Sequence, residues 1–283
     1  MKSDDFEYLR ALLHKQSGLV VNPEKVYLLE SRLTPLARRL GMDGLDDLVT
    51  KVRSTNDKTL ITEITEAMTT NESFFFRDKT PFDNLKNIVL PYLHKTRADR
   101  KRIRIWCAAA SSGQEPYSIA LSFKEEAAKW AGWNIEIVAT DICNKVLNKA
   151  REGEYSQFEV QRGLPVMLMM KYFEQRGDVW KISDEIRNMV TFKYLNLLHP
   201  FAGMGVFDVI FCRNVLIYFD QDTKKTVLQS MRSTLSSDGT MFLGTAETVL
   251  GISDLYKPVK GMRGMYVPAD IQAEPLAAYT PKV

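Results

Sequence analysis

The sequence has few residues of the kinds that bind metals or form disulfides. Its 283 residues include three cysteines and three histidines: Cys107, Cys143, Cys212, His14, His94 and His199. The cysteines lie far apart without a Cys-x-x-Cys pair, so their spacing predicts neither a disulfide framework nor a zinc site. The histidines are equally isolated. We therefore expect no bound metal and no Ser-His-Asp mechanism.

Long apolar runs and a charge excess are also missing. The longest uninterrupted apolar stretch, residues 105–110, is far shorter than the ~20 residues that a membrane-spanning helix needs. The start of the chain, Met1–Asp5, is acidic and has no apolar run behind it, so we expect no secretory signal and a soluble, cytoplasmic protein. Because 38 basic residues face 35 acidic ones, the net charge of +3 predicts neither nucleic-acid binding nor membrane insertion.

Hydrophobic residues make up 45% of the chain, enough for a substantial core. Residues 1–72 show only helical spacing, as in Leu60, Ile61, Ile64 and Met68, and predict an all-helical domain. From about residue 100, strand-like runs alternate with helical stretches. The four runs are Arg102–Trp106, Ile135–Thr140, Phe207–Cys212 and Thr240–Leu243. This alternation predicts an α/β domain over 73–267 with a doubly wound, mostly parallel, Rossmann-like sheet.

Residues 153–197 fit this alternation poorly. A hairpin is expected around Arg176-Gly177-Asp178, with Val179–Ile182 and Met189–Tyr194 as the neighbouring strands. We interpret the interval as a small antiparallel β insertion. Residues 268–283 combine three prolines with small side chains and are expected to form a flexible tail.

Polar or small residues follow three of the predicted parallel strands. Six small residues, 108–113, follow the first strand, Asp141 follows the second, and Arg213-Asn214 follows the strand at Phe207–Cys212. Because ligands bind at the carboxyl ends of parallel strands, these groups predict one crevice. The loop has neither the three glycines of a dinucleotide site nor the Gly-Lys-Ser/Thr of a P-loop, so a nucleoside with little phosphate fits better. A plain strand-to-helix turn and a helix cap at Asp141 remain open alternatives.

Three ordered blocks carry a family resemblance: residues 68–77 (MTTNESFFFR), 108–118 (AAASSGQEPYS) and 212–219 (CRNVLIYF). Over about residues 3–267 the chain resembles the chemotaxis receptor glutamate O-methyltransferases, the CheR family. The resemblance implies methyl transfer from S-adenosylmethionine to receptor glutamates, with S-adenosylhomocysteine as product. It also implies a set of cofactor-binding residues: Asn71, Ser73, Arg77, Ala109, Glu115, Asp141, Asn196, Leu197, Arg213 and Asn214.

Within that set, Arg77 suits the methionyl carboxylate of the cofactor, Glu115 its ammonium group and Asp141 its ribose. Arg77 and Tyr218 are the candidate catalytic residues, with Tyr218 positioning the acceptor. A glutamate acceptor has a reference pKa of about 4.3 and is ionised at neutral pH, so no general base is required. The implied reaction is therefore compatible with a sequence that has three isolated histidines. Apolar packing of Tyr218 and a surface ion pair of Arg77 with Asp78 are the alternative readings.

A basic stripe in the helical domain is the candidate receptor surface. Lys25, Arg32 and Arg39 follow one another at intervals of seven residues, which places them near one line along a helix, with Arg38 off that line. The predicted partners are glutamate-rich helices of methyl-accepting chemotaxis receptors, contacted by a monomeric enzyme. An ordinary solvated helix face is the alternative. Some family members also bind a peptide at the receptor terminus, but the turn between Phe173 and Val179 is shorter here, so no such tether is expected.

Three functions of other kinds compete with this interpretation. A nucleic-acid methyltransferase is disfavoured by the balanced charge. A binding module without catalysis would show broken cofactor positions, and none is broken. A nicotinamide-dependent oxidoreductase would need a different glycine loop. The sequence does not identify the receptors, the glutamates or any regulator.

Overall fold

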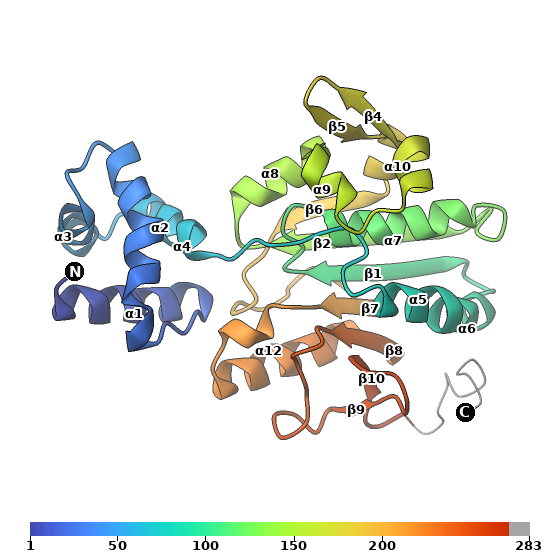
Figure 1. The fold of residues 1–283 in the computed structure, drawn as a ribbon. Coiled ribbons are helices and arrows are strands. Elements are labelled where there is room, and N and C mark those ends of the chain that lie inside the picture. The colour runs from blue at the N-terminus through green and yellow to red at the C-terminus, as the bar shows by residue number, and fades with distance from the viewer. Residues whose placement is uncertain (272–283) are drawn as a thin grey trace. The chain divides into compact units, whose positions relative to one another are not determined.

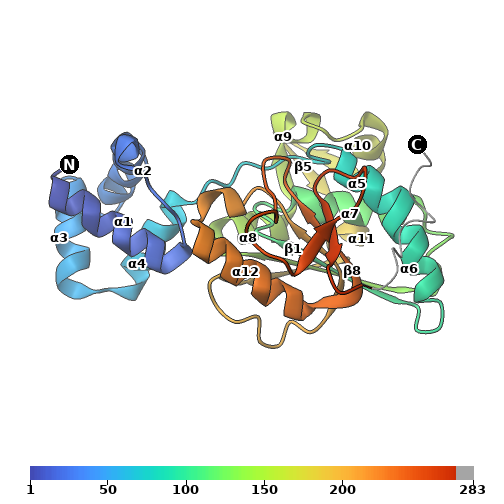
Figure 2. The ribbon, with the colours of Figure 1, turned by 90° about the horizontal axis from the view of Figure 1, so that it is seen from below.

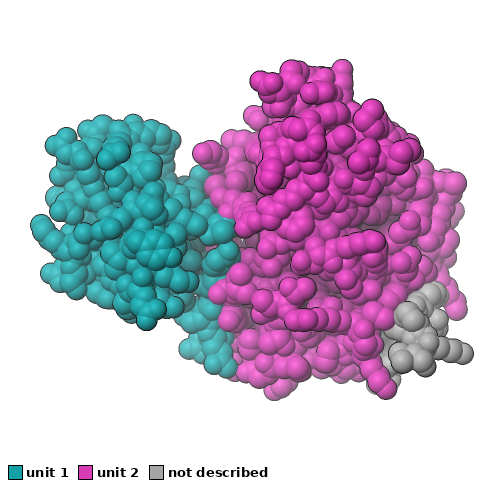
Figure 3. All heavy atoms as spheres, viewed as in Figure 1, with its two compact units in different colours: residues 1–70, 218–223 teal, residues 71–217, 224–283 magenta. Residues whose placement is uncertain are grey.

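The computed structural model describes residues 1–271, which form two compact units. Unit 1 comprises Met1–Thr70 together with Tyr218–Thr223, and the described part of unit 2 comprises Asn71–Ile217 and residues 224–271 (Figure 3). The change of unit after Thr70 lies close to the domain boundary that we placed after residue 72. Each unit has its own hydrophobic core.

Unit 1 is helical, as the apolar spacing predicts (Figure 2). Its elements are α1 (Ser3–Ser17), the 3-10 turn η1 (Pro23–Lys25), α2 (Val26–Arg39), α3 (Leu45–Thr55) and α4 (Lys58–Met68). Leu9, Leu33 and Ile64, from three different helices, are fully buried in a shared core. Asp57 caps α4 by accepting a hydrogen bond from the Thr59 backbone N–H at 2.8 Å.

Unit 2 is built on a seven-stranded sheet (Figure 1). The strands, in the order β6-β2-β1-β7-β8-β10-β9, are β6 (Val190–Tyr194), β2 (Asn134–Asp141), β1 (Arg102–Ala108), β7 (Phe207–Cys212), β8 (Leu235–Leu243), β10 (Met265–Pro268) and β9 (Tyr256–Pro258). The first five run parallel, and β10 and β9 are antiparallel additions at one edge. This confirms the mostly parallel, Rossmann-like sheet.

Helices cover the sheet because its strands are apolar on both faces. The helical elements that follow Thr70 in the chain are α5 (Thr80–Asn84), the π-helical turn η2 (Leu85–Val89), α6 (Leu90–Thr96), α7 (Gln114–Glu125), α8 (Asn144–Glu152), α9 (Gln157–Gln161), α10 (Val166–Tyr172), α11 (Asp184–Arg187), η3 (Leu216–Tyr218) and α12 (Gln221–Thr234). On β1, Ile103 and Ile105 pack into the core that α5 to α8 share. Trp106 alternates to the opposite face, where its ring packs edge-on against Phe201 at 4.9 Å between centroids.

The antiparallel insertion exists, but one strand that was predicted to belong to it lies in the main sheet. β4 (Phe173–Arg176) and β5 (Val179–Ile182) form the expected hairpin across Gly177-Asp178, and β3 (Glu154–Ser156) completes a three-stranded sheet (Figure 1). The predicted partner Met189–Tyr194 is instead β6, which pairs with β2 in the main sheet. Its alternation of buried and exposed residues suits an edge strand of either sheet, so the choice depends on a pairing distant in sequence.

The first residues of the predicted tail are ordered by contacts with unit 2. Pro268 ends β10, the Ala269 N–H donates to Leu255 O at 3.0 Å, and Asp270 pairs with Arg232. The remaining part, residues 272–283, lies outside the described residues. No helix within residues 1–271 is long and apolar enough to span a membrane.

Candidate functional site

The loop after β1 has an unusual backbone. Ala109 and Ser111 have positive φ angles of 56° and 51°, and Gly113 has φ of 92°. A Cβ atom on Gly113 would lie 3.0 Å from Ala150 Cβ and 3.2 Å from the Phe192 ring, so the turn is also tightly enclosed. The small residues that sequence analysis singled out therefore serve a tight turn that leads directly into α7.

Asp141 joins this loop to the end of β2. Its Oδ2 accepts a hydrogen bond from the Ser111 backbone N–H at 2.8 Å, and its Oδ1 accepts one from the Cys143 N–H at 2.9 Å. Asn71 reaches the same two loops, because its carbonyl accepts from Ser111 Oγ at 2.8 Å and its Nδ2 lies 3.9 Å from Cys143 Sγ. Three of the sequence motifs thus meet at the carboxyl ends of β1 and β2.

Glu115 and Arg213 form a buried ion pair at the start of α7. Arg213 Nη1 donates to Glu115 Oε2 at 3.0 Å, and Arg213 Nη2 donates to Asp78 Oδ2 at 2.7 Å and to Arg77 O at 2.9 Å. Burial raises the pKa of Glu115, and the charge of Arg213 opposes that rise. Arg213 Nε is buried without a hydrogen-bond partner among residues 1–271.

The other predicted cofactor residues lie on neighbouring segments of unit 2. Arg77 is half-buried, donates to Glu72 O at 2.9 Å and lies over the Phe74 ring at 5.5 Å, while Ser73 is half-buried in the same segment. Asn196 and Leu197 are buried just beyond β6, and Asn196 Oδ1 accepts from the Leu198 N–H at 3.0 Å. Among residues 1–271, the Arg77 guanidinium forms no ion pair with Asp78 or with another acidic side chain.

Glu247 is a buried residue that sequence reasoning missed. It follows β8 and is 8% exposed, and its carboxylate accepts backbone N–H bonds from Asn214, Val215, Ile217 and Gly244 at 2.7–3.3 Å. A lone glutamate in a loop gives no pattern that separates it from surface acids. The clue that the sequence does contain is Gly244, three residues earlier, where any Cβ would lie 2.7 Å from Glu247 Oε2.

The remaining predicted residues belong to unit 1. Tyr218 is half-buried, and its carbonyl accepts from the Val20 N–H at 2.9 Å. Arg32 Nη1 donates to Met68 O at 2.6 Å and Thr69 O at 3.0 Å, so this guanidinium covers the carboxyl end of α4. Arg39 pairs with Glu63 at 2.7 Å. Lys25 and Arg38 are exposed.

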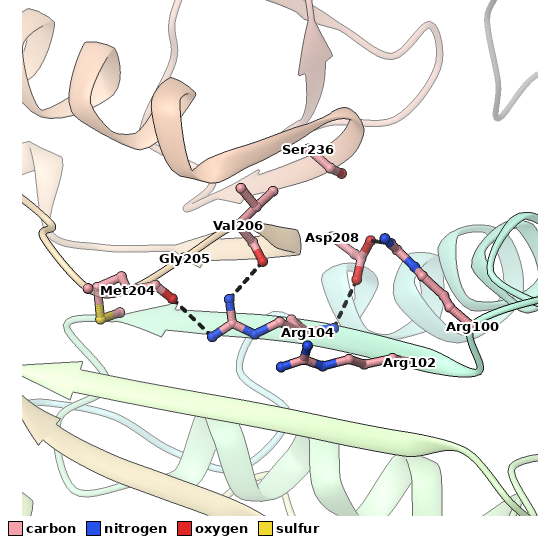
Figure 4. A pocket seen from close by; sticks show the side chains of 9 residues that line it. Arg100, Arg102, Arg104, Met204, Gly205, Val206, Asp208 and Ser236 are labelled. Atoms are coloured by element: carbon pink, nitrogen blue, oxygen red, sulfur yellow. Dashed lines mark hydrogen bonds and ion pairs between the residues drawn. The ribbon is translucent and has the colours of Figure 1, made fainter.

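A pocket of about 500 Å³ lies at the opposite, amino-terminal ends of the strands (Figure 4). Arg102 and Arg104 at the start of β1 and Asp208 on β7 line it. Arg104 donates to Glu136, Met204 O and Val206 O, and Asp208 accepts from the Arg104 N–H at 2.9 Å. The Arg104 guanidinium therefore holds the loop at residues 203–206 against β1, and this pocket is apart from the candidate site.

The hydrogen-bonding groups at the carboxyl ends of the strands suit a nucleoside that carries an amino-acid part. A carboxylate such as Asp141 can accept hydrogen bonds from ribose hydroxyls. The buried Arg213 Nε has no hydrogen-bond partner within residues 1–271, so it is available to donate to a ligand. Among the described residues, no group of three or more His, Cys, Asp or Glu side chains is arranged to hold a metal ion.

Comparison with known proteins identifies two family models. Residues 71–265 match the SAM-binding domain of CheR methyltransferases, and residues 4–69 match their all-alpha domain. The chain is 39% identical to chemotaxis protein methyltransferase Cher2 of Pseudomonas putida and 40% identical to chemotaxis protein methyltransferase 1 of Pseudomonas aeruginosa. Both matches cover 92% of this chain and 96% of the relative. A chemotaxis protein methyltransferase of Borreliella burgdorferi is 34% identical over 89% of this chain and 90% of its own length.

Proposed function

Because the chain belongs to the CheR methyltransferase family, we propose that it methylates glutamate side chains of chemotaxis receptors in the cytoplasm. The chain is a methyltransferase that depends on S-adenosylmethionine. The glutamate acceptor, the site residues and their roles are the proposal. The observation that carries it is the convergence of Asn71, Asp141 and the Glu115–Arg213 pair within one unit, at the carboxyl ends of β1, β2 and β7.

The proposed site binds the cofactor through groups that these contacts already orient. Asp141 holds the loop after β1 through the Ser111 N–H, and its carboxylate oxygens, which accept more than one bond each, also accept the ribose hydroxyls. Asn196, Leu197 and Asn214 border the same strand ends. Glu115 attracts the cofactor's ammonium group while Arg213 keeps the glutamate ionised, and Arg77 pairs with the methionyl carboxylate.

Methyl transfer to an ionised carboxylate requires alignment of the two reacting groups, and it requires no proton transfer. When bound, S-adenosylmethionine supplies a methyl group on a positively charged sulfur, and an ionised glutamate oxygen accepts it. The protein must remove water from that carboxylate and hold it in line with the bond that breaks, an effect that contributes up to ~7–11 kcal/mol in well-oriented reactions. We assign Tyr218 to position the acceptor, and Lys25 and Arg38 on unit 1 to attract the acidic receptor helix.

A labelling experiment tests this function. The chain is incubated with S-adenosylmethionine labelled in its methyl group and with a receptor cytoplasmic fragment. We expect label on the receptor that alkali releases as methanol, because methyl esters hydrolyse readily in base. A fragment with its candidate glutamates changed to glutamine is the control and should stay unlabelled. Alkali-stable label, or equal labelling of the control, would contradict a glutamate acceptor while leaving methyltransferase activity intact.

A further inference from the structure

The carboxylate of Glu247 is surrounded by backbone donors from two strand ends. Its Oε2 accepts from the Asn214 N–H at 2.8 Å and the Gly244 N–H at 2.7 Å. Its Oε1 accepts from the Val215 N–H at 2.9 Å and the Ile217 N–H at 3.3 Å. Successive N–H groups of this kind form an anion-binding concavity, and here the protein's own side chain occupies it.

The surrounding backbone is shaped for this one side chain. Gly244 lies so close that a Cβ would be 2.7 Å from Glu247 Oε2 and 2.9 Å from Asn214 Nδ2. Asn214 has φ of 60°, a left-handed conformation that asparagine tolerates better than most residues. The hydrogen bonds to its N–H and to the next N–H hold that conformation. The segment after β7 is therefore fixed to the end of β8 through Glu247.

We infer that Glu247 is a positioning residue for methyl transfer, holding the segment Arg213–Ile217 in the conformation that turnover requires. The inference rests on the proposed roles of Asn214 and Tyr218, because Asn214 lies in this segment and Tyr218 follows it directly. The side chain of Arg213 is held separately, by Glu115 and Asp78. Loss of the Glu247 contacts should therefore disturb alignment more than cofactor binding.

The variant Glu247→Gln removes the negative charge and one acceptor oxygen but keeps the volume of the side chain. It therefore tests the hydrogen bonds separately from the packing. An amide has one acceptor oxygen and one NH₂ group, which donates and cannot accept. In Glu247→Gln the NH₂ group must face two of the backbone N–H donors, whichever way the amide is turned. The variant keeps the packing of the side chain and loses about half of its hydrogen bonds, with donors opposed to donors.

Asp208→Asn is the matched control. Asp208 is also a buried acid, 4% exposed, and it accepts from the Arg104 N–H at 2.9 Å and Arg97 Nε at 2.8 Å. It lies on β7, the strand that leads into the segment Arg213–Ile217, but near the amino end of that strand and away from the candidate site. If Glu247 only stabilises the fold, the kcat values of Glu247→Gln and Asp208→Asn should therefore fall to a similar extent.

The experiment measures kcat and KM for a receptor fragment, the Kd of S-adenosylhomocysteine and the unfolding midpoint of each variant. Activities are compared about 20 °C below each variant's own midpoint. For Glu247→Gln we expect kcat to fall about tenfold or more and the Kd, to which Asn214 contributes, to rise by a smaller factor, whereas Asp208→Asn keeps its kcat. Gly244→Ala, which displaces the Glu247 carboxylate, should reproduce the defect and serves if Glu247→Gln does not fold.

The double variant Glu247→Gln with Tyr218→Phe separates this inference from the proposed function. If Glu247 acts through Tyr218, the two losses in kcat are less than multiplicative, since contacting or coupled groups are not additive. Full activity of Tyr218→Phe would remove the proposed role of Tyr218, and a fall in kcat in Glu247→Gln would still support positioning through the segment. A normal kcat in Glu247→Gln, or a loss no greater than that of Asp208→Asn, would overturn the inference.

Discussion

Arg213 Nη1 lies 3.0 Å from Glu115 Oε2, and both side chains are almost completely buried. Sequence reasoning assigned each residue to the cofactor independently. The structure shows that each is the charge partner of the other, with Asp78 as a second acid beside Arg213. A ligand ammonium group at Glu115 would therefore share its carboxylate with a guanidinium, which links binding at this site to the stability of unit 2.

Arg213→Met should destabilise the protein in a manner that depends on pH. Burial raises the pKa of Glu115, so the folded state keeps this proton to a higher pH than the unfolded state does. The neutral glutamate needs no partner, and the ionised one does. We expect a loss of ~3–5 kcal/mol at about pH 8, the range for breaking a buried pair, and a smaller loss at about pH 5.

Denaturant unfolding at the two pH values measures this effect. Arg176→Met is the control, because Arg176 and its partner Glu174 are both exposed, and it should cost little at either pH. An equal loss for Arg213→Met at both pH values would show that Glu115 ionisation is not involved.

Asp141→Ala should weaken S-adenosylhomocysteine binding by ~1.5–3 kcal/mol, the range for hydrogen bonds to a charged group. The same change frees the Ser111 and Cys143 N–H groups, so some stability should also be lost. Asp141→Asn retains one acceptor oxygen and should lie between the wild type and the alanine variant. Calorimetric titration measures all three, with NAD as a ligand that should not bind. Unchanged affinity in both variants would remove Asp141 from the site.

Tyr218→Phe should lower kcat and leave the Kd of S-adenosylhomocysteine nearly unchanged, the pattern of a group that acts only in the transition state. The backbone contact between Tyr218 O and the Val20 N–H is retained in this variant, so the segment should keep its place in unit 1. Steady-state kinetics and calorimetry test both expectations. A weakened Kd with unchanged kcat would assign Tyr218 to binding.

Charge reversal on unit 1 should slow receptor methylation, but the residues must be chosen from the structure. Arg32 is unsuitable, because it binds Met68 O and Thr69 O and its loss would disturb α4. Lys25→Glu with Arg38→Glu should reduce kcat/KM for receptor by about tenfold and weaken its salt dependence, since exposed charges are screened within ~8 Å at physiological ionic strength. Cofactor binding should be unaffected.

Lys51→Glu with Lys58→Glu, on α3 and α4 of the same unit, gives an equal change of charge and should have little effect. Methylation that is insensitive to salt and to both reversals, but is abolished by removing the carboxyl terminus of the receptor, would assign recognition to the β3-β5-β4 sheet instead.

Local patterns predicted the parts of the fold that depend on local properties. Phe207–Cys212 was predicted with its observed bounds. A short apolar run bordered by polar residues indicates a buried strand whichever neighbouring strand it pairs with. The pairing of β6 was missed because two sheets offered suitable partners. The contacts of Arg32 and Glu247 could not be predicted, since both side chains bind backbone groups more than about 30 residues away, and such contacts leave no local pattern in the sequence.

The membership of residues 218–223 in unit 1 bears on how the protein is made. His14 Nε2 lies 2.6 Å from Asp220 Oδ2, and the Val20 N–H bonds to Tyr218 O, so α1 and the turn after it depend on a segment far along the chain. A ribosome releases the amino-terminal helices first. These helices reach their full set of contacts only after Thr223 has been synthesised, and by then β1, β2, β6 and β7 of the unit 2 sheet have also been synthesised. A fragment that ends at Thr70 is thus an incomplete unit.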